Sequence, residues 1–199
     1  SNVIAYGPTM IKTTSRKVLD KFKISTNEYY LIVGRLIPDN NSELIIKGFL
    51  KSSSNKKLVV VGDVTYKDKY ARIVKAMSSE RVILTGYIKS NEDLSTLYIN
   101  SFCYIHGHEF GGTNPTMVNA LDLNCSILAL KTKFNEEMLL ERKTIFFKKD
   151  IENIKISINE FEKNFENLKK INKNYTLPLR YKWSEIVDQY LELFYKLIN

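Results

Sequence analysis

The sequence predicts one α/β domain, a parallel β-sheet with helices on both of its faces. Six short runs of apolar and β-branched residues are nearly continuous in hydrophobicity, which is typical of strands that are buried on both sides. Segments with helical periodicity lie between these runs, and this alternation favours a parallel sheet. The length of 199 residues suits one good-sized domain or at most two small ones.

The six predicted strands are rich in Val, Ile, Leu, Tyr and Phe, residues that suit a pleated and buried surface. They are residues 29–33, 57–61, 81–85, 101–105, 126–130 and 144–147. Because these runs do not alternate between apolar and polar residues, we expect them to form the centre of the domain.

Amphipathic helices are predicted where apolar residues lie three and four positions apart. They are residues 42–50, 69–77, 92–99, 116–123, 151–171 and 182–197. The apolar face of the last helix includes Trp183, Tyr190, Phe194 and Tyr195. This face is too wide for one side of a sheet, so we expect it to pack on a further domain and to stay exposed without one.

Charge and composition exclude several classes of protein. Lys and Arg number 30 against 22 Asp and Glu, but the basic residues are scattered and do not interleave with aromatic ones, so nucleic acid is not expected as a partner. Cys103 and Cys125 lie in apolar runs without zinc-ligand spacing, which excludes a disulfide framework and a structural zinc. No secretory signal opens the chain. We expect a protein that lies in the cytoplasm or is bound peripherally at the inner face of the cell membrane.

The richest candidate site is the loop of residues 106–116, because ligands of open parallel sheets bind beyond the carboxyl ends of the strands. Gly111 and Gly112 would let a ligand approach the backbone closely. Thr113, Asn114 or Thr116 could cap the next helix, whose free N–H groups can hold a phosphate. The simpler alternative is a loop whose glycines only make the turn.

Arg35 follows the first predicted strand and its five donors suit a diphosphate, although a surface arginine paired with a carboxylate is the alternative. His106 and His108 lack a clear third metal ligand, so we expect hydrogen bonding from them, and neither a metal nor a cofactor. The motifs of a P-loop, a dinucleotide site and a serine nucleophile elbow do not occur in the sequence.

These features occur in the order found in a known family. The segments are Gly34-Arg35-Leu36, Gly62-Asp63, residues 81–87, the helix with Leu94, Leu97 and Tyr98, and residues 106–121. Together they resemble, over nearly the whole chain, the carboxy-terminal domain of retaining GT-B glycosyltransferases of the glycogen synthase and sucrose synthase superfamily, family 4. Residues 106–115, 38–41 and 134–137 resemble more narrowly the bacterial rhamnosyltransferases that build capsule or exopolysaccharide.

The resemblance implies a Rossmann-like domain with a site for a dTDP- or UDP-linked sugar. Arg35 would contact the diphosphate, the backbone of residues 111–114 would hold phosphate and sugar oxygens, and the main chain at Tyr87 and Ile88 would contact the base. The donor-binding residues that it implies are Gly34, Arg35, Asn40, Tyr87, Ile88, His106, Glu109, Gly111, Gly112, Thr113, Asn114, Thr116 and Asn119. No catalytic residue is assigned.

Two positions, Asn40 and Asn119, depart from the family pattern. Asn40 stands where the family has a lysine five residues after the arginine, so one positive charge is missing. Asn119 stands where the family has the glutamate that binds the ribose hydroxyls. Glu109 does not align clearly with the first family glutamate.

The resemblance thus implies the donor-binding half of a glycosyltransferase, in which residues 1–180 bind the donor and residues 181–199 form a terminal crossover helix. The enzyme would transfer rhamnose to a growing surface polysaccharide. The acceptor would be a glycan or a lipid-linked sugar. The amino-terminal acceptor domain would lie outside this chain, which by itself would be inactive. Two alternatives are a nucleotide-sugar-binding or regulatory module without turnover, and an unrelated flavodoxin-like binding domain.

Overall fold

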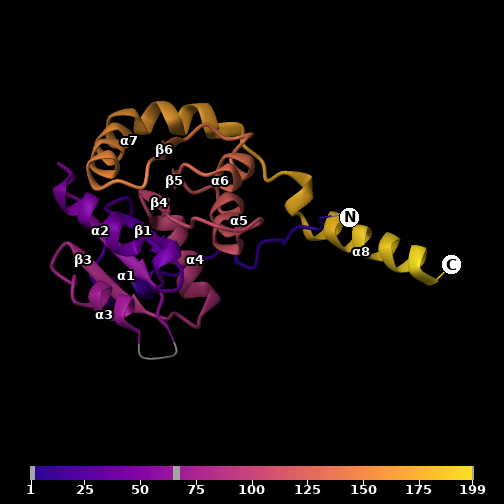
Figure 1. Ribbon diagram of the computed structural model, residues 1–199, viewed down its shortest axis with the longest axis horizontal. Helices are drawn as coiled ribbons and strands as arrows, with labels where there is room; N and C mark the ends of the chain where they lie inside the picture. The colour runs from indigo at the N-terminus through magenta and orange to yellow at the C-terminus, as the bar shows by residue number, and fades with distance from the viewer. Residues whose placement is uncertain (1–2, 65–67, 199) are drawn as a thin grey trace.

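The computed structural model describes residues 3–64 and 68–198 and confirms the predicted fold class. Residues 1–2 of the predicted donor-binding unit (1–180) and residue 199 of the predicted crossover helix (181–199) lie outside the described residues. Six parallel strands form one sheet in the order β3-β2-β1-β4-β5-β6 (Figure 1). They are β1 (Tyr29–Val33), β2 (Lys57–Val61), β3 (Val82–Gly86), β4 (Cys103–His106), β5 (Ile127–Leu130) and β6 (Ile145–Phe147).

Eight α-helices surround or extend this sheet in the described part of the chain. They are α1 (Lys17–Phe22), α2 (Ser42–Lys51), α3 (Lys69–Lys75), α4 (Asn91–Asn100), α5 (Pro115–Asp122), α6 (Lys133–Met138), α7 (Ile151–Ile171) and α8 (Trp183–Ile198). Short 3₁₀ turns lie at Pro38–Asn40, Asn172–Asn174 and Leu179–Tyr181. The sequence did not predict α1 and α6, because a helix of 6 residues is too short to show a periodic face. Among the described residues, none of the helices has the length and apolar character needed to span a bilayer.

The predicted limits of the fourth strand were wrong by two residues at its start. Ser101 ends α4 instead, because its N–H and its hydroxyl both donate to the carbonyl of Tyr98. The strand then continues one residue further than predicted, and His106 pairs in parallel register with Ala129 of β5. His106 is therefore a buried strand residue and not the first residue of a loop.

The strands are buried on both faces, as their composition predicts. Tyr30 and Ile32 of β1 pack in one apolar layer with α2, α3 and α7, whereas Tyr29 and Leu31 pack in the opposite layer with α1, α4 and α5. The order of the strands reverses at β1, since β2 lies on one side of it and β4 on the other. The carboxyl ends of β1 and β4 therefore meet at the point where ligands bind in open α/β sheets.

The long helix α7 begins at a well-formed cap. The Asp150 carboxylate accepts a hydrogen bond of 2.7 Å from the N–H of Asn153, and the Asn153 side chain accepts one of 2.6 Å from the N–H of Lys148. Both side chains satisfy backbone N–H groups at the start of the helix.

Replacing Asp150 with alanine should lower the free energy of unfolding by about 1 kcal/mol, because the first turn of α7 loses its cap. Urea denaturation followed by circular dichroism measures this change. Asp188→Ala is the matched control, since Asp188 is an exposed residue inside α8. Equal midpoints for the two variants would contradict a stabilising role for the cap.

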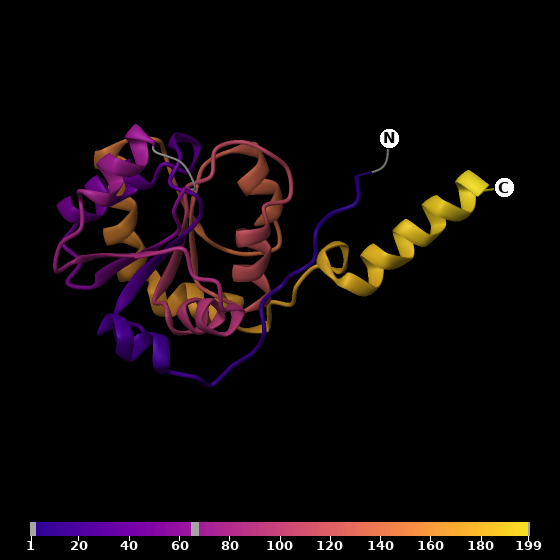
Figure 2. The ribbon, with the colours of Figure 1, turned by 90° about the horizontal axis from the view of Figure 1, so that it is seen from below.

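The last helix, α8, extends away from the sheet together with the amino-terminal segment (Figure 2). Of its described side chains only Ile186 is buried, while Trp183, Tyr190, Phe194 and Tyr195 are 43–65% exposed. The indole N–H of Trp183 donates to the carbonyl of Pro8 at 2.7 Å. The apolar face of α8 is thus not covered by its own domain, as its width predicted.

Candidate functional site

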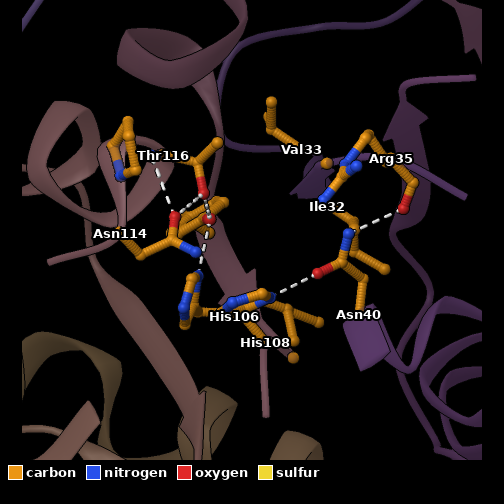
Figure 3. A pocket seen from close by; sticks show the side chains of 13 residues that line it. Ile32, Val33, Arg35, Asn40, His106, His108, Asn114 and Thr116 are labelled. Atoms are coloured by element: carbon orange, nitrogen blue, oxygen red, sulfur yellow. Dashed lines mark hydrogen bonds between the residues drawn. The ribbon is translucent and has the colours of Figure 1, made fainter. Parts of the chain in front are cut away.

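A cavity of about 210 Å³ lies at the reversal of strand order. Its walls come from the ends of β1 and β4, from the segment after β1, and from the start of α5 (Figure 3). It is lined by Ile32, Val33, Gly34, Arg35, Asn40, Tyr104, Ile105, His106, Gly107, His108, Asn114, Pro115 and Thr116. The topology of the sheet thus brings residues about 70 positions apart in the chain into one site.

Gly34 and Arg35 form the wall that follows β1. The N–H of Gly34 donates to the carbonyl of Val61 at 3.0 Å, and a Cβ at Gly62 would lie only 1.8 Å from the Gly34 oxygen. Arg35 is exposed and takes part in none of the ion pairs between described residues. The alternative from the sequence, a surface arginine paired with a carboxylate, is therefore not seen among the described residues. The guanidinium of Arg35 is available to an anion.

Asn40 connects Arg35 to His108. Its Nδ2 donates to the Arg35 carbonyl at 2.7 Å, and its Oδ1 lies 2.6 Å from Nδ1 of His108. Because Nδ2 is the donor end of the amide, Oδ1 must accept, so Nδ1 of His108 carries a hydrogen. Figure 3 shows these two side chains pointing toward each other across the lower part of the cavity.

A chain of hydrogen bonds joins the start of α5 to β4. Asn114, one of the three predicted cap residues, caps α5. Its Oδ1 accepts a hydrogen bond of 3.0 Å from the N–H of Thr116 and one of 2.8 Å from the Thr116 hydroxyl. The Tyr104 hydroxyl lies 2.8 Å from Thr116 Oγ1 and 2.8 Å from Nδ1 of His106. With the Thr116 proton directed to Asn114, Tyr104 donates to Thr116 and accepts from Nδ1–H of His106.

His106 is consequently a neutral residue of the cavity floor. It is 2% exposed, and its Nε2 has no hydrogen-bond partner among the described residues. Burial, with a smaller contribution from His108, lowers the pKa of His106 to about 3. The side chain therefore stays uncharged at neutral pH.

The cavity suits an anion. Among the described residues that line it, Arg35 is the only formal cation and no carboxylate occurs. Glu109 lies outside this lining and pairs with Lys149 at 2.6 Å, and that contact lowers the pKa of the Glu109 carboxyl below its usual value. The N-terminus of α5 adds the positive end of a helix dipole.

The structure brings six of the thirteen candidate residues into the cavity lining. They are Gly34, Arg35, Asn40, His106, Asn114 and Thr116. The others lie outside this lining: Tyr87, Ile88, Glu109, Gly111, Gly112, Thr113 and Asn119. Tyr87 follows β3, two strands away from the cavity, and is 73% exposed.

Asn119 has a different partner from the one the resemblance implies. Its buried side chain accepts a hydrogen bond of 2.9 Å from the N–H of Thr9, so the amino-terminal segment covers this position. The thirteen candidate residues did not include Tyr104 and His108, although both line the cavity. The density of polar residues after β4 was a signal for His108, whereas Tyr104 belongs to an apolar strand that gave no such signal.

Comparisons with known proteins agree with this fold. Residues 14–176 match the family "Glycosyl transferases group 1". A glycosyltransferase structure from Rickettsia africae superposes with a TM-score of 0.83 at 15% identity, covering 100% of this chain and 57% of that one. Anabaena Alr3699/HepE in complex with UDP and glucose gives a TM-score of 0.71 at 15% identity, and the match covers 90% of this chain and 51% of that one.

A curated relative from Campylobacter jejuni is 23% identical over 131 residues, which are 65% of this chain and 35% of that protein. It is named N-acetylgalactosamine-N,N'-diacetylbacillosaminyl-diphospho-undecaprenol 4-alpha-N-acetylgalactosaminyltransferase. This chain thus spans about a third of that relative and about half of the two structures. The narrower likeness to rhamnosyltransferases is not confirmed by these relatives, whereas the Rossmann-like fold of GT-B glycosyltransferases is. With most of its length matched by one family, the chain belongs to the group 1 glycosyl transferases.

Proposed function

We propose that the cavity binds the diphosphate and the sugar of a nucleoside diphosphate sugar, and that the chain is the donor-binding part of a glycosyltransferase. The observation that carries this proposal is the composition of the cavity at the reversal of strand order. Among the described residues, Arg35, which makes no ion pair, and the positive end of the α5 dipole meet at this cavity, and no carboxylate lines it. A guanidinium and a helix N-terminus both favour a bound diphosphate.

The chemistry supported by this arrangement is electrostatic. Arg35 and the positive end of the α5 dipole would stabilise the negative charge that develops on the leaving diphosphate, and the cavity would orient the sugar. Acceptor binding, to a glycan or a lipid-linked sugar, would come from chain outside these 199 residues.

UDP is the nucleotide that we propose, and N-acetylgalactosamine is the sugar to test first. UDP is the ligand of the Anabaena structure, and N-acetylgalactosamine appears in the name of the Campylobacter jejuni relative. dTDP-rhamnose, for transfer into a surface polysaccharide, is the donor that the narrower resemblance favours.

Calorimetric titration with UDP-N-acetylgalactosamine, UDP-glucose and dTDP-rhamnose tests this proposal. We expect measurable but weak binding, because a site that is open on one side is less preorganised than a closed one. Tighter binding of dTDP-rhamnose would favour the rhamnosyl version. Binding of none of the three would contradict a donor site.

A binding module without turnover is the second candidate, because Thr9 holds the Asn119 side chain at the position expected to bind ribose. A transfer assay separates the two. These 199 residues should transfer no sugar, whereas a chain extended at its amino end by a domain of about 150 residues should do so. Donor binding without transfer by the extended chain would support the module.

A further inference from the structure

The cavity has too little positive charge for the ligand just proposed. A nucleoside diphosphate sugar carries one negative charge on each of its phosphates at neutral pH, but Arg35 is the only formal cation among the described lining residues. A lining histidine that gains a proton would supply the missing charge. The two histidines of the chain, His106 and His108, both line the cavity.

His106 is unsuited to this role. Its Nδ1–H is committed to Tyr104, and the whole side chain is buried at 2% exposure. Burial opposes the charged form so strongly that its pKa is lowered to about 3. A charge on His106 at neutral pH would lack solvent and a counter-ion within the cavity floor.

His108 differs in burial and in the position of its free nitrogen. It is half-buried, and Asn40 holds its Nδ1–H at 2.6 Å. A proton gained or lost by the ring therefore resides on Nε2. This nitrogen lies 3.7 Å from the position of a Cβ at Gly111, so it lies beside the segment that leads into α5.

Charged and titratable groups reach His108 from both sides of the cavity. From the segment after β1, Arg35 lowers the pKa of His108 and Asp39 raises it. From β4 comes the neutral ring of His106 at 6.1 Å between centroids, while Glu109 is neutralised by Lys149. The backbone of Phe110 raises the pKa, and α6 contributes the uncharged Asn135, whose Nδ2 donates to the His108 carbonyl.

Partial burial is the largest of these effects, and it lowers the pKa of His108 below the ordinary histidine value. In the free protein the ring is therefore mostly neutral at pH 7 and above. An anion placed between Arg35 and Gly111 would reverse this preference, because a nearby negative charge favours the protonated ring.

We propose that His108 is a donor-binding residue that takes up a proton from solvent at Nε2 when the diphosphate binds, and then donates Nε2–H to a phosphate oxygen. Asn40 positions the ring for this contact by accepting from Nδ1–H. This inference rests on the proposed function, since it assumes that the cavity binds a nucleoside diphosphate sugar.

Affinity should consequently depend on pH with a defined sign. The complex holds more protons than the free protein, so lowering the pH favours binding. One proton per complex allows at most a tenfold change per pH unit. We expect UDP-N-acetylgalactosamine to bind about tenfold more tightly at pH 6 than at pH 8. Each phosphate of this probe carries one ester bond and one anhydride bond and keeps a single strongly acidic oxygen, so the ligand itself does not titrate between these values.

Calorimetry with this probe gives two measurements. Dissociation constants at pH 6, 7 and 8 give the slope, and titrations at one pH in two buffers of different ionisation enthalpy give the number of protons taken up. Because the chain has only two histidines, NMR titration of their ring resonances also gives the pKa of His108 with and without the probe. We expect the ligand to raise it.

Two variants identify the residue. His108→Gln keeps a polar side chain but cannot be protonated, so its affinity should change little with pH. Arg35→Gln is the matched control, because it should lose affinity at all pH values while it keeps the slope. Circular dichroism melting curves establish that both variants are folded.

The possible outcomes separate this inference from the proposed function. Binding of the probe with equal affinity at pH 6 and pH 8, or a wild-type slope in His108→Gln, overturns the role of His108 and leaves the donor site in place. Failure of the wild-type chain to bind at either pH overturns the donor site and this inference with it. Proton uptake that disappears in His108→Gln and persists in Arg35→Gln supports the proposal.

Discussion

Replacing Arg35 with alanine is expected to weaken binding of UDP-N-acetylgalactosamine by about 10- to 150-fold. The guanidinium lines the cavity and makes no ion pair among the described residues, so its donors are available to the diphosphate. A charged hydrogen bond of this kind contributes about 1.5–3 kcal/mol, which corresponds to that range. Isothermal titration calorimetry at fixed pH and salt measures the loss.

Arg72→Ala is the control for this change. Arg72 is also an exposed arginine, but it lies on α3 and does not line the cavity. It therefore reports the effect of net charge alone, which we expect to be small at physiological salt. An Arg35→Ala chain that binds as tightly as Arg72→Ala would remove Arg35 from the site.

Replacing Gly62 with alanine is expected to lower the free energy of unfolding by about 3 kcal/mol and to impair nucleotide binding. The φ angle of Gly62 is 143°, a value that residues with a Cβ rarely adopt. The added Cβ would also lie 1.8 Å from the carbonyl oxygen of Gly34, a backbone atom that cannot rotate away. Strain and overpacking each cost about 1–3 kcal/mol.

The second effect follows from the position of Gly34, which lines the cavity beside Arg35. Relief of the clash must move the end of β1 and hence the guanidinium. Urea denaturation and calorimetry measure the two effects. Gly112→Ala is the stability control, because its φ is not positive and its Cβ would have no atom within 4 Å. If both variants unfold at the same urea concentration, the close packing of Gly62 on Gly34 does not limit stability.

Several features could be predicted because they depend on neighbouring residues in the chain. The apolar runs predicted the strands to within two residues, and the period of 151–171 predicted the ends of α7. Asn114 was one of three predicted caps of α5, and the helix starts one residue before its predicted start at residue 116. Arg35 and the segment after β4 were candidates because they follow strands.

The partners of the polar side chains could not be predicted in this way. Asn40 and His108 are separated by 68 residues, and Thr9 and Asn119 by 110, so their contacts exist only because β4 lies beside β1 and the amino-terminal segment crosses α5. The sequence indicated that Asn40 leaves out the positive charge of a family lysine, and that Asn119 replaces the family glutamate that binds the ribose hydroxyls. In the structure, Asn40 orients a histidine and Asn119 binds the chain's own backbone.

The sequence by itself determined the fold class, the two-sided burial of the strands and the edge of the sheet where a ligand would bind, because these properties follow from hydrophobic period and strand direction. The tertiary structure decided which side chains meet at that edge, which histidine stays neutral and which can be protonated, and that the apolar face of α8 lies open. The physical reason is that burial, hydrogen-bond partners and pKa depend on distances in space, which strand order sets and local sequence does not.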